Sequence, residues 1–168
     1  MEQKISKITI NEEQQQAFMR EAIRLASQNV EMQGGGPFGA VIVREGKIIA
    51  AAANHVTTAN DPTAHAEINA IREACKKLNT FDLQGCEIYA SCEPCPMCLA
   101  SIYWAHIDKI YYAGTRHDAE MAGFDDSFIY NELAKNMEER TIPIIKLLHD
   151  EGVNPLQKWQ ECVNRMEY

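Results

Sequence analysis

The 168-residue sequence has no hydrophobic run long enough to span a membrane, no internal repeat and no low-complexity tract. A transmembrane helix needs about 20 consecutive apolar residues, and the densest apolar runs here, at residues 50–53 and 110–113, are far shorter. The first residues also lack the apolar core of a secretory signal. These absences favour one globular domain, residues 1–168, with a cytoplasmic location and no membrane partner.

Positive charge is scarce as well. The chain has 16 Lys and Arg against 24 Asp and Glu, which gives a formal net charge of −8. Proteins that grip nucleic acid contact its phosphates through Lys and Arg and are usually basic. The charge therefore argues against a nucleic-acid partner and fits a small uncharged ligand better.

Three of the six cysteines, Cys92, Cys95 and Cys98, fall within seven residues of sequence. In a reducing compartment cysteines stay as thiols, and clustered ones bind metal more often than they form disulfides. The other three are scattered, which is typical of buried, inert thiols. The cluster is therefore where chemistry is expected.

The first part of the chain predicts a helix followed by a hairpin. Asn11 and Gln14 form a capping-box pair at the start of a segment with helical apolar spacing. Residues 38–44 and 47–53 are apolar and β-branched, and only Glu45-Gly46 separates them. This spacing predicts a tight β-hairpin.

Strands and helices are then expected to alternate. Asp61-Pro62-Thr63 predicts a helix start, and Asn154-Pro155 predicts a second one near the C-terminus. The remaining expected elements are strands at residues 86–91, 109–114 and 142–148, and helices at residues 96–105 and 126–135. The pattern indicates an α/β fold, a three-layer α-β-α sandwich with a mixed five-stranded sheet.

Two short motifs carry the chemistry: His65-Ala66-Glu67 and Pro94-Cys95-Pro96-Met97-Cys98. Each is expected to open a helix after a loop, so both helix N-termini can converge on one point. His65, Cys95 and Cys98 then supply one imidazole and two thiolates. Three protein ligands plus water is the pattern of a catalytic zinc, whereas a structural zinc is closed by a fourth protein ligand.

Glu67 has a role beside such a zinc. A zinc-bound water has a pKa near ~7, and a neighbouring carboxylate can take its proton and pass it on. Glu67 is two residues from His65, so the two side chains do not point the same way and Glu67 need not be a ligand.

Two other metal interpretations stay open. Cys92, Cys95 and Cys98 have the spacing of an iron–sulfur run that lacks its fourth cysteine. A structural zinc held by the same three residues and His65 is the main non-enzyme alternative, and it leaves Glu67 without a role.

The paired H-x-E and P-C-x-x-C motifs are the signature of zinc deaminases. From about Gly35 to Tyr168 the chain resembles the cytidine deaminase superfamily and, within it, bacterial guanine deaminases. Segments 35–43, 60–67 and 91–98 resemble many deaminases, whereas 102–105, 122–130 and 167–168 resemble guanine deaminases rather than tRNA adenosine deaminases.

The resemblance implies the roles of individual residues. It makes His65, Cys95 and Cys98 the ligands of one Zn²⁺ per chain and Glu67 the catalytic proton shuttle. It also implies a homodimer in which the C-terminal segment, at about residues 115–168, is exchanged between subunits.

Four further residues are implied to bind the substrate. Asn54 would hydrogen-bond the base, Phe38 would pack against its face, and Asp126 and the partner's Tyr168 would enclose its edge. Simpler interpretations remain for each: a turn cap, a core side chain, a solvated loop charge and a frayed terminus.

The activity implied by the resemblance is hydrolysis of guanine to xanthine and ammonia. Guanosine is the main alternative substrate. Cytosine, an amino-triazine such as ammeline and adenosine in tRNA are others, and a structural zinc module without turnover is the non-enzyme alternative.

Overall fold

The computed structural model describes residues 10–168, which form two compact units, one ending at Asp126 and the other spanning Ser127–Tyr168. Residues 1–9, which the sequence predicts to contain no secretory signal, lie outside the described part. Among residues 10–168 no helix combines the length and the apolar character needed to cross a bilayer.

The first unit is built on a mixed four-stranded sheet in the order β2-β1-β3-β4. Strand β1 is antiparallel to β2 and β3, and β3 is parallel to β4. Glu45 and Gly46 join β1 to β2 with φ values of 52° and 73°, which suits a two-residue hairpin turn and confirms the predicted hairpin. The strands are β1 (Gly39–Arg44), β2 (Lys47–Ala53), β3 (Cys86–Cys92) and β4 (Lys109–Gly114).

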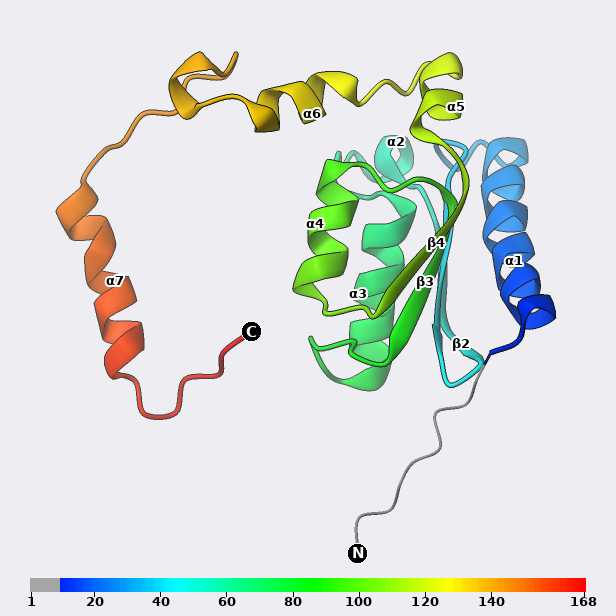
Figure 1. The fold of residues 1–168 in the computed structure, drawn as a ribbon, viewed down its shortest axis with the longest axis horizontal. Coiled ribbons are helices and arrows are strands. Elements are labelled where there is room, and N and C mark those ends of the chain that lie inside the picture. The colour runs from blue at the N-terminus through cyan, green and yellow to red at the C-terminus, as the bar shows by residue number, and fades with distance from the viewer. Residues whose placement is uncertain (1–9) are drawn as a thin grey trace, which may run out of the picture. The chain divides into compact units, whose positions relative to one another are not determined.

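Helices cover both faces of this sheet, with α1 on one face and α3 and α4 on the other (Figure 1). Because successive strand residues point to opposite faces, Val41 packs against the α1 layer and Ile42 against the α3 layer. The predicted three-layer arrangement is therefore present. The helices of this unit are α1 (Glu12–Glu31), α2 (Val56–Ala59), α3 (Ala66–Leu78), α4 (Pro96–Trp104) and α5 (Arg116–Met121).

The first helix begins as predicted and the next long helix does not. Asn11 caps α1 through the expected capping box with Gln14. The predicted start at Asp61-Pro62-Thr63 is wrong, because α3 begins at Ala66. The Asp61 carboxylate instead accepts hydrogen bonds from the Thr63 N–H (2.8 Å) and hydroxyl (2.7 Å), so these residues form an Asx turn ahead of the helix.

The second unit contains α6 (Ser127–Ala134), the 3₁₀ helix η1 (Met137–Glu139) and α7 (His149–Glu161). Residues 142–148 form no strand, so the prediction of a fifth strand is wrong. Pro143 has no N–H to offer to a ladder, and no strand of the described chain pairs with this run. Helix α7 starts before the predicted Asn154, and Pro155 lies inside it.

Candidate functional site

Two helix N-termini carry the candidate metal ligands. His65 is the N-cap residue of α3 and Cys95 is the N-cap residue of α4, while Cys98 lies in the first turn of α4. Pro96 follows Cys95 at the first helical position, where proline is well suited. The predicted convergence of the two helix starts is therefore confirmed: the ligand atoms of the three residues all lie within 4.8 Å of one another.

The spacing of these atoms fits a tetrahedral zinc ion. The His65 Nδ1 atom is 3.6 Å from the Cys95 Sγ atom and 3.5 Å from the Cys98 Sγ atom. Zinc bonds of about 2.1 Å to nitrogen and about 2.3 Å to sulfur, set at tetrahedral angles, place such atoms roughly 3.6 Å apart. The donor set of one imidazole and two thiols is also one that zinc prefers.

The surroundings favour the ligand form of Cys95. A hydrogen bond from the Cys98 thiol and the nearby His65 lower the pKa of Cys95 to about 4. The hydrogen bond with Cys95 in turn raises the pKa of His65. Both helix N-termini add partial positive charge, which favours thiolate over thiol.

Cys92 is not part of this cluster. Among the described residues, the group that can hold a metal consists of His65, Cys95 and Cys98. The Cys92 thiol instead donates to the Thr115 carbonyl oxygen at 3.4 Å. The iron–sulfur run and the four-ligand structural zinc both require Cys92, so the geometry supports neither.

Glu67 lies beside the metal ligands in a buried position. Its side chain is only 7 % exposed, and its Oε2 atom accepts a hydrogen bond from the Cys98 thiol at 3.4 Å. Burial raises the pKa of Glu67. A raised pKa makes a carboxyl group a better proton acceptor, which suits it to general acid–base catalysis.

Asn54 presents its amide group in a fixed orientation. Its Oδ1 atom accepts hydrogen bonds from the Gly36 N–H (3.2 Å) and the Val56 N–H (3.1 Å). Its Nδ2 atom makes no hydrogen bond to any other residue within 10–168, and so stays available as a donor. Gly35 permits this packing, because a Cβ atom there would lie 2.4 Å from the Asn54 carbonyl oxygen.

Two further asparagines hold the backbone around Asn54, and sequence reasoning missed both. The Asn29 Nδ2 atom donates to the carbonyl oxygens of Gly36 and Asn54, each at 2.8 Å. The Asn69 Nδ2 atom donates to the carbonyl oxygens of Ala53 (2.9 Å) and Ala64 (3.2 Å). The segment before His65 is thus tied to the segment before Asn54. Asn29 could have been found from its place on the buried stripe of α1.

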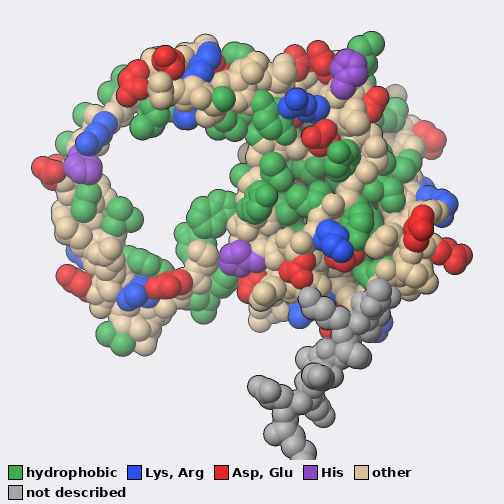
Figure 2. All heavy atoms as spheres, viewed as in Figure 1, with side chains coloured by type: hydrophobic (Ala, Val, Ile, Leu, Met, Phe, Trp, Pro, Cys, Tyr) green, Lys and Arg blue, Asp and Glu red, His purple; other side chains and the backbone are tan. Residues whose placement is uncertain are grey.

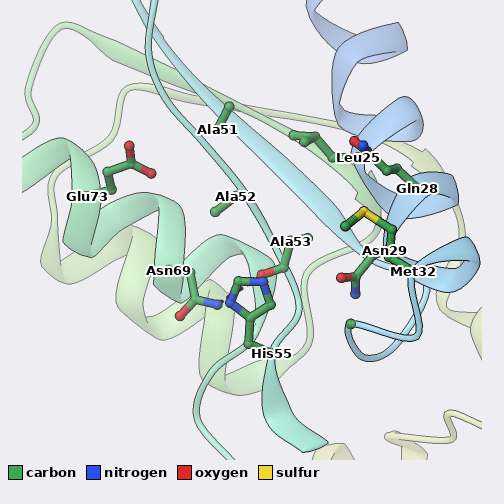
Figure 3. Close-up of a pocket in the computed structure, with 11 residues that line it drawn as sticks. Leu25, Gln28, Asn29, Met32, Ala51, Ala52, Ala53, His55, Asn69 and Glu73 are labelled. Atoms are coloured by element: carbon green, nitrogen blue, oxygen red, sulfur yellow. Dashed lines mark hydrogen bonds between the residues drawn. The ribbon is translucent and has the colours of Figure 1, made fainter. Parts of the chain in front are cut away.

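Asn29 and Asn69 also line a hollow of about 480 Å³ beside β2 (Figure 3). In the close-up, Asn29 extends from α1 and Asn69 from α3 on either side of the end of β2. None of the three metal-ligating side chains belongs to its lining. This hollow is therefore distinct from the metal centre.

Two more residues of the predicted substrate site, Phe38 and Asp126, lie in the first unit. The Phe38 ring meets the Phe124 ring edge-on, with centroids 5.0 Å apart and planes at 84°. Phe38 also packs against the core. Burial, and next the negative charge of Cys95, raise the pKa of Asp126. The predicted Phe38 and Asp126 thus lie on the same unit as the metal centre, and Phe124 is an addition that its segment's resemblance to deaminases could have suggested.

Tyr168 is in the second unit, where it is 74 % exposed. Large apolar side chains of that unit are also exposed in the single chain, and hydrophobic side chains are displayed along its surface (Figure 2). The most exposed include Ile145, Leu147 and Val163, at 82 %, 81 % and 95 %. Tyr168 therefore belongs to one compact unit. The other unit contains the metal ligands and the remaining predicted site residues, which are Glu67, Asn54, Phe38 and Asp126.

A known family matches the part of the chain that carries the metal centre. The family model of the cytidine and deoxycytidylate deaminase zinc-binding region matches residues 12–114. This range includes His65, Glu67, Cys95 and Cys98.

Similar proteins extend the likeness to the remainder of the chain. Guanine deaminase of Bacillus subtilis (strain 168) is 53% identical over 153 residues, which cover 91% of this chain and 98% of that protein. The X-ray structure of guanine deaminase from Bacillus subtilis matches with a TM-score of 0.89 at 52% identity, covering 95% of this chain and 99% of that one. A tRNA-specific adenosine deaminase of Aquifex aeolicus (strain VF5) is 47% identical over 96 residues, 57% of this chain and 63% of that protein.

Proposed function

The chain belongs to the family of the cytidine and deoxycytidylate deaminase zinc-binding region, and we propose that it hydrolyses guanine to xanthine and ammonia. The observation that carries this proposal is the similarity to guanine deaminase of Bacillus subtilis over nearly the whole of both chains. The similarity to a tRNA-specific adenosine deaminase covers a smaller part of each protein. The acidic net charge of −8 also suits a small base better than a polynucleotide.

The metal centre supports hydrolysis. His65, Cys95 and Cys98 would hold zinc, which would supply Lewis-acid chemistry by lowering the pKa of a water molecule to about 7. Glu67 takes a proton from the attacking water and delivers it to the ring nitrogen next to the carbon that bears the amino group. It then moves the remaining proton of that water, from the new hydroxyl group on the carbon, to the amino group, which leaves as ammonia while the carbon keeps the oxygen as a carbonyl.

The substrate contacts follow from the orientation of the side chains. The Asn54 Nδ2 atom donates to an acceptor on the purine, since its Oδ1 atom is already occupied by two backbone N–H groups. Phe38, backed by Phe124, offers an aromatic surface to the purine ring. The Asp126 carboxylate accepts from an N–H on the purine edge. Together these contacts select a flat base with donors and acceptors on its rim.

The test is the rate of ammonia release from guanine, guanosine, cytosine and adenosine by the zinc-loaded protein. We expect kcat/KM for guanine to exceed the other three by at least about 100-fold, because a site built for particular hydrogen bonds strongly disfavours analogues that leave its polar groups unpaired. Faster release from guanosine would move the proposal from bases to nucleosides. Release from adenosine alone would contradict the proposed contacts.

We also propose that a C-terminal segment is exchanged within a homodimer, so that Tyr168 of one subunit closes the other subunit's site. The exchanged part begins beyond Asp126 rather than at about residue 115, because Phe124 packs on Phe38 of its own chain. The part of this segment beyond Asp126 is a compact unit of its own. Its exposed apolar side chains are what an element that packs on a second copy would present.

Mixing two inactive variants tests this exchange. A Glu67→Ala chain and a chain that lacks Tyr168 are unfolded and refolded together at equal amounts. Random pairing of exchanged dimers would restore about a quarter of the wild-type sites, because half of the dimers then carry one complete site. If each chain closes its own site, the mixture stays as inactive as its two components.

A further inference from the structure

The loop that carries the cysteine motif is joined to the start of α5 by three contacts. The last pair of the parallel β3–β4 ladder is Cys92 with Gly114. Beyond it, the Glu93 N–H donates to the Gly114 carbonyl oxygen at 2.8 Å, and the Cys92 thiol donates to the Thr115 carbonyl oxygen at 3.4 Å. In the third contact, the Glu93 Oε2 atom accepts from the Arg116 N–H at 3.1 Å.

The Glu93 contact adds to the local capping box of α5. The Thr115 hydroxyl accepts from the Asp118 N–H at 3.2 Å, and the Asp118 carboxylate accepts from the Thr115 N–H at 2.7 Å. The capping box pairs the N–H groups of Thr115 and Asp118 but leaves the Arg116 N–H, which Glu93 pairs. Glu93 thereby ties the first residue of α5 to a different segment of the chain, which comes immediately before the metal ligand Cys95.

Helix α5 leads directly to Phe124 and to Asp126, the proposed substrate contact of the same unit. The chain folds back tightly after the helix, since the Gly123 N–H donates to the Glu120 carbonyl oxygen and the Phe124 N–H to the Ala119 carbonyl oxygen, each at 2.9 Å. Phe124 then meets Phe38 edge-on. Where α5 starts therefore decides where Phe124 is placed, with Asp126 two residues beyond it.

We propose that Glu93 is a positioning residue, which sets the placement of Phe124 and Asp126 relative to the metal ligands by holding Arg116 against the cysteine loop. The effect on substrate affinity rests on the proposed function, whereas the effect on the segment 116–126 does not. Glu93 touches neither the reacting atoms nor the metal. Its influence depends on the reach of its carboxyl group rather than on its charge.

Two conservative variants separate reach from charge. Glu93→Asp keeps the charge but shortens the side chain by one methylene, which withdraws the acceptor from the Arg116 N–H. Glu93→Gln keeps an acceptor at the original reach and removes the charge. Glu120→Gln is the matched control, because Glu120 is on α5 and faces His117 at the surface.

The variants are compared in the full-length, zinc-loaded protein. For Glu93→Asp we expect KM for guanine and the inhibition constant of the product xanthine to rise about fivefold to tenfold, the size expected from one lost hydrogen bond. We expect kcat to change less than about twofold, the zinc content to stay at one per chain, and amide hydrogen exchange across residues 116–126 to accelerate. Glu93→Gln and Glu120→Gln should match the wild type.

Two other patterns of defects among these variants would overturn the proposal. If Glu93→Gln is defective and Glu93→Asp is not, Glu93 acts through its charge on the metal centre. If Glu93→Asp lowers the melting temperature without changing hydrogen exchange in 116–126 or the binding of xanthine, Glu93 is merely structural. Failure of the wild type to deaminate guanine would refute the proposed function alone, since hydrogen exchange still reports on the tie between Glu93 and Arg116.

Discussion

Replacing Glu67 by glutamine is expected to lower kcat for guanine by about 10³- to 10⁴-fold, the upper part of the range for loss of a general acid–base group. Glu67 is buried, and its carboxylate accepts a hydrogen bond from the Cys98 thiol, so it is in place to move a proton beside the metal ligands. Glutamine has nearly the same shape and can still accept a hydrogen bond, but it cannot take up a proton. The ligands His65, Cys95 and Cys98 are unchanged, so zinc should remain bound.

The measurement is single-turnover release of ammonia, with zinc quantified in the same sample. Glu73→Gln is the matched control, because Glu73 lies on the same helix and pairs at the surface with Lys77 at 2.9 Å. We expect this control to retain wild-type kcat. A Glu67→Gln protein that binds zinc and turns over guanine at more than about a tenth of the wild-type rate would refute the assigned proton transfer.

The sequence predicts the metal centre well because its geometry depends on local structure. His65 and Glu67 lie on one helix start, and Cys95 and Cys98 lie on another. Proline and short spacing fix the direction of each side chain within one helical turn. Only the convergence of two helix ends had to be supplied by the fold.

The surroundings of the site are harder to predict, since they depend on contacts between distant residues. The side-chain amide of Asn54 is oriented by the backbone N–H groups of Gly36 and Val56. The backbone carbonyl oxygen of Asn54 accepts a hydrogen bond from the Asn29 side chain. No short motif encodes such contacts. Another example is the ring contact between Phe38 and Phe124, which lie far apart in the sequence.

The errors in the predicted fold have local causes. Proline and asparagine or aspartate mark both turns and helix starts, so Asp61-Pro62-Thr63 predicts a helix start although it forms an Asx turn. The apolar run at residues 142–148 has strand-like composition, but a strand also needs a partner, which composition alone does not reveal. The hairpin was predicted correctly because its turn and its two strands are adjacent in sequence.

Removal of zinc is expected to have an effect as large as the loss of Glu67. Treatment with a chelator should lower guanine turnover by at least about 10³-fold, because water without the metal has a pKa near 15.7 instead of about 7. Zinc should restore the activity of the wild type. It should not restore Cys98→Ala, since this variant leaves only His65 and Cys95 of the three ligands.

The measurement that tests the account most directly is a zinc titration of the stripped wild-type protein with guanine as substrate. Bound zinc and released ammonia are measured at each step. The account predicts that ammonia release rises in proportion to bound zinc and stops rising at one zinc per chain. Binding of one zinc per chain without any release of ammonia from guanine would contradict it, and would instead indicate a zinc that only stabilises the fold.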